Sequence, residues 1–386
     1  MRLLAILLLA AGLIRSAPSA AFDHEGYVWQ RRWTPELAQA LADAVDVFAG
    51  FRVLVGEVDV RGMRRIAVDW PALASAARPV TLVLRIPGAA PRIDALVAAA
   101  RLREALAAAA AAGVKVAGIE IDHDCARSQL AAYATLLREL RASVEAPAWS
   151  ITALPDWLHD PALGELLAEV DTSVLQVHAV AKPGDGLFDV AQALRWVRAY
   201  ARVAPRPFRV ALPAYATRVT QDRDGRILAI DSDAATSPVF DERARELVVD
   251  PRRVDAVLKR LRDAPPPRFD GIVWFRLPLA SDRRAWSMAT VRAVVAGEPL
   301  DRPLRAERVR IGDGPNVDVV LRNDLSIDRL APRTIAVPAH CREGEGVAGY
   351  RFDAERQRFD SNAPPLLKPG ASRTIGWIAC QGSSTP

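Results

Sequence analysis

The sequence predicts an α/β fold: a (β/α)8 TIM-like barrel followed by a small all-β domain. Eight apolar, β-rich runs alternate with helical runs before residue 300, as in an eight-stranded barrel. The structural alternative is a doubly wound open sheet, which is disfavoured because no glycine-rich phosphate loop follows the first strand. After Pro299 the helical periodicity stops, and short strand-like runs separated by Pro, Gly and Asn follow.

The barrel strands are expected at Tyr27–Arg31, Arg52–Asp59, Val80–Ile86, Val116–Asp124, Trp149–Leu154, Val174–His178, Phe208–Tyr215 and Gly271–Pro278. The clearest helices between them are expected at Pro91–Ala112, Ser128–Ser143, Asp189–Ala201, Pro251–Arg262 and Asp282–Ala296. Gly113 stands where a C-cap glycine would end the first of these helices.

The alternation breaks between Thr217 and Pro238. The run VTQDRDGRILAID predicts two short strands joined at Asp224-Gly225, a dipeptide typical of hairpins. Asp222 and Asp224 also resemble half of a calcium loop, but the remaining ligands are missing, so a plain turn is favoured. The hairpin would follow the seventh strand, at the C-terminal face of the barrel.

Residues 1–21 have the pattern of a secretory signal peptide, with a basic start, an apolar stretch and a small-residue cleavage site. We therefore expect a periplasmic or secreted protein; the alternative is an uncleaved anchor. The domains would be the signal at 1–21, the barrel at 22–299 and a small β-sandwich-like domain at 300–386. The net charge of +5 falls to about +3 without Arg2 and Arg15, which is too weak to indicate nucleic acid.

Three cysteines occur, and an oxidising compartment permits a disulfide. Cys341 and Cys380 both fall in the predicted β-domain, so we expect them to be bonded to each other. Cys125 would remain free, and without a CxxC pair redox chemistry is not indicated.

The run VAGIEIDHDC, residues 116–125, carries the main functional signal. Side chains alternate faces along a strand, so Glu120, Asp122 and Asp124 share one face. The isoleucines between them favour the helix layer, which directs the three carboxylates into the barrel. Acids this close repel, and at least one should hold a proton with a raised pKa. Barrel enzymes place catalysis at this end of a strand.

This arrangement suits glycosidic cleavage, which needs a general acid beside ionised partners. We expect Asp124 at the rim to be the general acid, with Asp122 ionised and Glu120 deeper. A structural alternative is an acidic cluster paired to arginines such as Arg85 and Arg276.

Further polar and aromatic groups lie at other strand ends and would bind the substrate: Glu57, Arg85, Gln176, His178, Tyr215, Trp274 and Arg276. Glu57 is the reserve candidate for a second carboxylate. Trp274 would stack on a sugar ring, and Trp157 could widen that platform. A zinc site at IDHD is disfavoured because His123 faces away from its acidic neighbours, so no metal and no cofactor are expected.

The phrases AGIEIDHD, SITALPDWL and VLQVHA resemble a bacterial family of secreted proteins, domain of unknown function 3142, over about residues 22–299. The chain is more distantly similar to the family-18 glycoside hydrolases, the chitinase barrels, whose fourth strand carries DGxDxDxE. On that resemblance Glu120 matches the middle acid, Asp122 the last aspartate and Asp124 the catalytic glutamate. Ala117 replaces the first acid, and Asp124 is one methylene shorter than the glutamate.

Two functions follow. The first is an exported glycoside-hydrolase-like protein that acts on a polysaccharide through the carboxylates in the barrel. The second is a non-catalytic carbohydrate-binding or accessory protein that retains the barrel. The three clustered acids favour the first, because a binding protein has little use for them.

Overall fold

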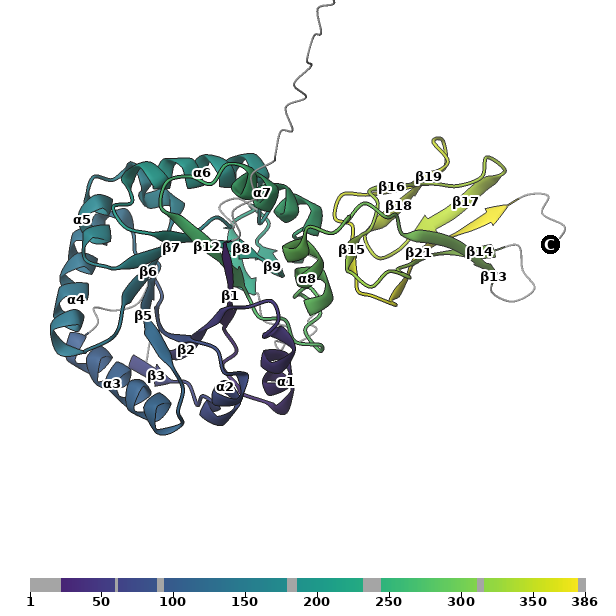
Figure 1. The fold of residues 1–386 in the computed structure, drawn as a ribbon. Coiled ribbons are helices and arrows are strands. Elements are labelled where there is room, and N and C mark those ends of the chain that lie inside the picture. The colour runs from purple at the N-terminus through teal and green to yellow at the C-terminus, as the bar shows by residue number, and fades with distance from the viewer. Residues whose placement is uncertain are drawn as a thin grey trace, which may run out of the picture.

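A computed structural model describes residues 22–59, 62–88, 94–178, 186–231, 244–310 and 316–380. Eight parallel strands form a closed barrel, surrounded by a ring of helices, which confirms the predicted fold class (Figure 1). The expected signal peptide at 1–21 lies outside the described residues.

The barrel closes because the first strand pairs with both its neighbour in sequence and the last strand. In their order around the barrel the strands are β1 (Asp23–Val28), β2 (Gly50–Asp59), β4 (Val80–Ile86), β5 (Val116–His123), β6 (Trp149–Ala153), β7 (Thr172–Gln176), β8 (Phe208–Pro213) and β12 (Phe269–Phe275). A short strand, β3 (Gly62–Arg65), pairs antiparallel with β2. All eight predicted strands are present. The first was placed too late in the chain, because its pairing begins at Asp23 and the backbone leaves the sheet after Val28.

One helix separates each barrel strand from the next. The helices are α1 (Pro35–Ala44), α2 (Trp70–Ala76), α3 (Ala95–Ala111), α4 (Leu130–Ser143), α5 (Ala162–Ala168), α6 (Val190–Val203), α7 (Pro251–Asp263) and α8 (Met288–Ala296). Two short 3-10 turns, η1 (Arg127–Gln129) and η2 (Pro155–His159), precede α4 and α5. Gly113 has φ +73° just beyond α3, as predicted for a C-cap glycine.

Side chains at the N-caps determine where several helices begin. Asp189 and Asp250 accept hydrogen bonds from the first turns of α6 and α7, and Ser287 does so for α8. The last of these helices was predicted from residue 282. It starts at Met288, because residues before Ser287 form a turn in which Asp282 binds two backbone amides.

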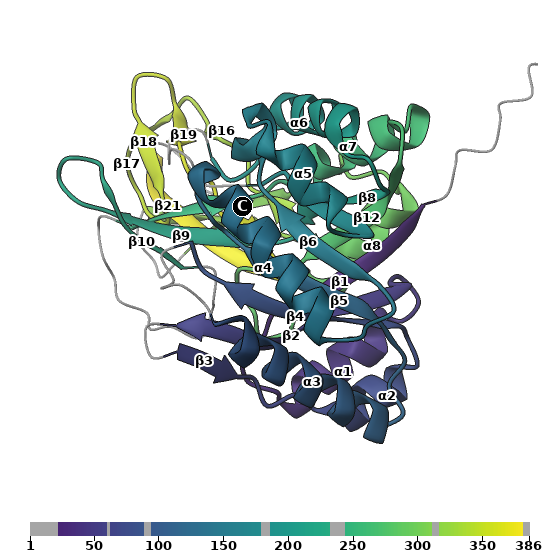
Figure 2. The same cartoon turned by 90° about the vertical axis from the view of Figure 1, so that its left-hand side faces the viewer.

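The predicted hairpin is present after β8, the seventh barrel strand. It consists of β9 (Ala216–Gln221) and β10 (Ile227–Asp231), and β11 (Ala244–Val248) completes a three-stranded antiparallel sheet. Asp222 Oδ1 accepts from the amides of Asp224 and Arg226 at 2.9 and 2.8 Å, and Gly225 has φ +80°. Asp222 thus stabilises a turn, and Figure 2 shows the hairpin projecting beyond the barrel wall.

The C-terminal β-region comprises residues 305–380, and its described parts, 305–310 and 316–380, form strands and turns without a helix. A four-stranded sheet contains β13 (Arg305–Arg310), β14 (Asn316–Arg322), β21 (Ser372–Cys380) and β17 (Cys341–Gly346). The remaining strands are β16 (Thr334–Ala336), β19 (Arg358–Ser361) and β18 (Tyr350–Asp353) in one sheet, and β15 (Arg329–Leu330) with β20 (Leu366–Leu367) in another. Ile375 and Ile378 of the first sheet share one apolar cluster with Ile335 and Phe359 of the second.

A buried aspartate joins this region to the barrel. Asp328 Oδ2 accepts from the backbone N and Oγ of Ser287 at 2.6 and 2.8 Å, and from Thr290 Oγ1 at 2.7 Å. The backbone N of Asp328 donates back to Thr290 Oγ1 at 2.7 Å. The first turn of α8 is therefore closed by a residue of the C-terminal β-region, and Ile327 beside it packs into the barrel core.

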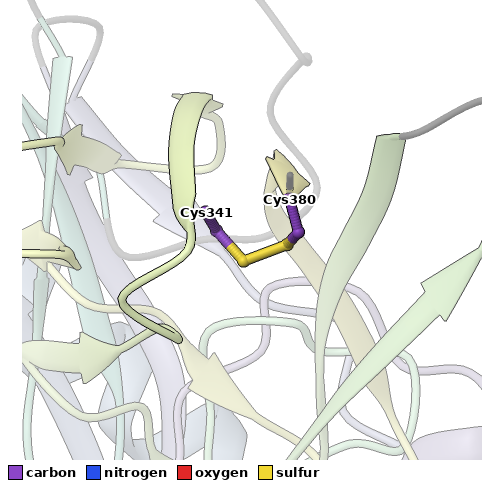
Figure 3. Close-up of a disulfide and its surroundings, with 2 residues drawn as sticks. All are labelled: Cys341 and Cys380. Carbon is purple, nitrogen blue, oxygen red and sulfur yellow. A yellow bond between two sulfur atoms is a disulfide. The ribbon is translucent and has the colours of Figure 1, made fainter. Parts of the chain in front are cut away.

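Cys341 and Cys380 form a disulfide between the paired strands β17 and β21, as expected (Figure 3). Cys125 is free and buried, and burial raises its pKa to about 11. The described residues include no helix that is both long and apolar enough to cross a membrane.

The disulfide should stabilise the C-terminal β-region. Its sequence separation of 39 residues corresponds to about 4 kcal/mol in the chain-entropy model. We expect urea unfolding to show a loss of that order on reduction, and the double variant C341S/C380S to match the reduced protein with or without reductant. An unchanged wild-type midpoint on reduction would contradict this.

Asp328→Ala should weaken the junction, because it leaves the hydroxyls and the amide at the start of α8 without their buried acceptor. We expect a loss of about 2–4 kcal/mol in the free energy of unfolding and faster limited proteolysis near residues 297–304. Asp324→Ala, at an exposed position four residues away, is the matched control. Equal midpoints for the two variants would show that the contact contributes nothing.

Candidate active site

The three acids of β5 face the barrel lumen at increasing exposure. The side chains of Glu120, Asp122 and Asp124 are 0%, 4% and 31% exposed. Ile119 and Ile121, which alternate with these acids, are fully buried in the outer core, against the helices. The alternation predicted for this strand is confirmed, and Asp124, which follows its last residue, is the most accessible of the three acids.

Glu120 belongs to a polar network in the depth of the lumen. It accepts from the hydroxyl of Tyr27 at 2.7 Å and of Thr152 at 3.2 Å, and it forms an ion pair with Arg52. Arg52 also donates to Glu25 at 2.6 Å. Burial opposes the charge of Arg52, but Glu25 and Glu120 outweigh it and raise the Arg52 pKa. Glu120 is therefore a paired structural carboxylate.

Arg85 of β4 binds the two outer acids together. One terminal nitrogen pairs with Asp122, and the other donates to Asp124 at 2.5 Å. The guanidinium lies 5.6 Å from the centre of the Trp29 ring, within cation–π range. Burial opposes the charge of Arg85, yet Asp122 and Asp124 raise its pKa, so it stays cationic between them.

Asp122 is the acid whose pKa is raised, to about 6. Burial is the largest cause and outweighs the attraction of Arg85, while Asp124 and Glu120 raise the pKa further. The expectation of a raised pKa within the cluster is confirmed. At pH 7 the Asp122 carboxyl is still mostly ionised, but below about pH 6 it binds a proton, because the side chain is buried and shares the Arg85 guanidinium with Asp124.

Glu57 lies in the same row of the barrel. The strand register aligns Glu57 with Arg85 and Arg85 with Asp122, across three neighbouring strands. Arg31 donates to both Glu57 carboxylate oxygens, at 2.8 and 2.7 Å, and this pair lowers the Glu57 pKa. The lumen thus holds an ionised carboxylate on β2 and, on β5, the buried Asp122 with its raised pKa.

The aromatic side of the lumen is formed by His178, Tyr215 and Phe275. The His178 ring lies 5.7 Å from Tyr215 and 5.6 Å from Phe275, measured between centroids. Burial lowers the His178 pKa to about 4, so this imidazole is neutral at pH 7. Gln176, the last residue of β7, is half-buried, and its amide donates to the His178 carbonyl at 2.9 Å.

Trp274 and Trp157 do not line the lumen, which corrects their predicted roles. Both are fully buried in the outer core. The Trp274 indole donates to His24 Nδ1 at 3.1 Å, and the Trp157 indole donates to the Cys125 carbonyl at 3.0 Å. Neither ring can stack on a sugar, and Phe275, which the sequence reasoning did not select, has the inward position on β12.

Arg276 is buried and pairs with Asp282, so it does not bind the acids of β5. The arginines that do so are Arg85, which was predicted, and Arg52, which was not. A charged residue inside the apolar run FRVLV was the available signal for Arg52. His123 faces outward, as predicted, with Nδ1 3.0 Å from the Ile86 carbonyl.

Among solved structures, the chain is similar to the spore cortex-lytic enzyme SleL of Bacillus cereus, with 13% identity, a TM-score of 0.49 and coverage of 72% of this chain and 74% of that one. It is similar to the class V chitinase of Nicotiana tobaccum, with 12% identity, a TM-score of 0.46 and coverage of 73% and 100%. A xylanase and alpha-amylase inhibitor protein of Scadoxus multiflorus matches at 15% identity, with a TM-score of 0.46 and coverage of 72% and 100%. No curated protein matches the sequence.

Two family models match. Residues 311–381 fit a domain of unknown function, DUF8456, which covers most of the C-terminal β-region. Residues 76–280 fit another domain of unknown function, DUF3142, over β4 to β12 and more than half of the chain. The chain therefore belongs to the DUF3142 family, the one that its sequence motifs resemble.

Proposed function

We propose that the protein is an exported glycoside hydrolase that cleaves a polysaccharide in the barrel lumen. The observation that carries this proposal is the pair Asp122 and Asp124: a buried carboxyl with a pKa of about 6 beside an accessible one. Two acids bridged by one guanidinium carry a net charge of −1 and can bind one proton between them.

In this mechanism Asp124 delivers the shared proton to the glycosidic oxygen, because it is the member of the pair that substrate can reach. The bond between that oxygen and the anomeric carbon breaks, and a water molecule attacks the carbon. Glu57, ionised by Arg31, takes a proton from the water. Glu57 then releases that proton to solvent and solvent returns one to the aspartate pair, so each cycle consumes one water molecule and no cofactor.

The spacing of the strands favours inversion at the anomeric carbon. Glu57 lies on β2 and the aspartate pair lies at the end of β5, with β4 between these strands. Two strand spacings correspond to about 10 Å, closer to the roughly 6.5–9.5 Å between the carboxyls of inverting enzymes than to the roughly 5 Å of retaining ones. Tyr215 and Phe275 would contact the sugar from the aromatic side of the lumen.

Export is proposed from the disulfide and the N-terminal pattern of residues 1–21. A disulfide is typical of proteins that fold in an oxidising compartment. The mechanism requires no partner other than an oligo- or polysaccharide.

One observation favours the second candidate, a carbohydrate-binding or accessory protein without catalysis. Each lumen acid has an arginine partner: Arg52 for Glu120, Arg85 for Asp122 and Asp124, and Arg31 for Glu57. The same pairing would neutralise the buried charges of a barrel that binds carbohydrate without cleaving it.

Asp124→Asn should abolish hydrolysis while the fold and sugar binding persist, because the amide has the shape of the carboxyl but donates no acidic proton. We expect a loss of 10²–10⁴-fold in kcat, measured as reducing ends released from bacterial exopolysaccharides and chitin oligomers. Glu57→Gln should lose a similar factor, and NMR of fresh product should show the inverted anomer.

Asp43→Asn, on an exposed face of α1, is the matched control and should leave the rate unchanged. Cleavage that survives Asp124→Asn would refute the assignment of the acid. Saturable sugar binding without cleavage by the wild-type protein, across the whole panel, would instead establish the accessory role.

Asp122 should make stability depend on pH in the direction opposite to an ordinary paired aspartate. The pKa of Asp122 is about 6 in the folded protein, whereas an ordinary aspartate, as in the unfolded chain, has a pKa of 3.8. Between pH 3.8 and pH 6 the folded state therefore keeps a proton that the unfolded chain has lost. This contribution favours folding below pH 4, declines through that window and is constant above pH 6.

Asp122→Asn removes that decline. The stability of the variant relative to wild type should therefore rise by about 1–3 kcal/mol from pH 4 to pH 7, measured by urea unfolding at several pH values. The difference for Asp43→Asn should stay flat. A relative stability of Asp122→Asn that is constant or falls with pH would exclude a raised Asp122 pKa.

A further inference from the structure

A second cavity lies away from the lumen, between the start of α7 and the C-terminal β-region. Its volume is about 480 Å³, enough for one sugar ring with a substituent. Arg252 and Arg253 line it from α7, and Arg329 and Arg333 line it from the chain around β15. We name this cavity the α7 cleft. It lies outside the barrel wall.

Arg329 is the unusual residue of the α7 cleft. It is only 6% exposed, and its Nε has no hydrogen-bond partner within the described ranges. Burial, and the positive charge of Arg252 beside it, lower the Arg329 pKa. A buried nitrogen donor without a hydrogen-bond partner is costly, and each such group in a folded protein requires an explanation.

The acids in the α7 cleft leave an excess of positive charge. Four arginines line the cavity, against Asp250 and Asp301, and one of the four, Arg253, pairs with Asp189 at 2.9 Å. Asp250 is already engaged, because it caps the first turn of α7 and pairs with Arg252 at 2.6 Å. Asp301 lies on the exposed side of the cleft. Because Asp250 already caps the start of α7, the positive charge that is open to an anion in the cleft is that of Arg329 and Arg333.

We propose that the α7 cleft binds an oxyanion group, a carboxylate or a phosphate ester carried by a saccharide, with Arg329 as its principal ligand. The planar guanidinium can donate two parallel hydrogen bonds to such a group. Because α7 follows a barrel strand, it begins on the C-terminal side of the barrel, the side on which the lumen opens. An anionic sugar in the cleft would therefore lie on the same face of the barrel as Asp124. Its binding there would not depend on hydrolysis in the lumen.

The test is isothermal titration calorimetry on the full chain in a low-salt buffer without phosphate. The probes are glucose 6-phosphate, glucuronate, inorganic phosphate and glucose. We expect the two anionic sugars to bind in the millimolar range or tighter and glucose to bind at least tenfold more weakly. Equal affinity for glucose and glucose 6-phosphate would overturn the proposal. Tighter binding of inorganic phosphate than of either sugar would overturn the saccharide part of it.

Arg329→Gln should weaken binding of both anionic sugars at least tenfold. Arg373→Gln, at an exposed position on β21, is the matched control and should bind like wild type. Without ligand, Arg329→Gln should have a higher Tm than wild type, because it removes a buried charge. Glucose 6-phosphate should raise the Tm of the wild-type protein but not that of the variant.

Arg333→Gln provides a second variant, since this arginine lines the cleft from an exposed position and its change leaves the buried core intact. It should weaken binding several-fold. Wild-type affinity in both Arg329→Gln and Arg333→Gln would refute the site. Because binding in the α7 cleft does not involve the lumen acids, Asp124→Asn should bind the anionic sugars like wild type. Failure of the hydrolase proposal and failure of the cleft proposal therefore give different results.

Discussion

The ion pair between Glu120 and Arg52 is the constraint on which the interior of the barrel depends. Both side chains are buried in the lumen, where an unpaired charge would be strongly destabilising. Tyr27 and Thr152 occupy further positions on the Glu120 carboxylate, so four strands are joined at one group. Above this paired charge the two other acids differ, because Asp122 is buried and has a raised pKa while Asp124 is accessible. The proposed hydrolysis relies on that difference.

The fold was predictable because the barrel strands and their helices have distinct periods in the sequence. On β5 the acids alternate with Ile119 and Ile121, so the inward face could also be predicted. On β12 it could not. The run FDGIVWF is apolar on both faces, since both faces of a parallel sheet are covered, and no alternation shows that Trp274 points outward and Phe275 inward.

The partners of the acids were less predictable than the acids themselves. Arg85 is adjacent to Asp122 in the strand register, and a model of neighbouring strands suffices to pair them. Arg52 reaches Glu120 across an intervening strand, and Arg276 turns back to Asp282, six residues away. Which acid each arginine pairs with depends on how far its side chain can extend inside the closed barrel. The raised pKa of Asp122 has the same origin, because burial in the finished barrel is its main cause.

The strand order of the C-terminal β-region has a consequence for biogenesis. Strand β21 pairs with both β14 and β17, so the strand at the centre of the four-stranded sheet is the last of them to be synthesised. The four-stranded sheet is therefore complete only after residue 380 has been synthesised. The buried contact of Asp328 with the first turn of α8 thus belongs to a region whose sheet is completed later than the barrel.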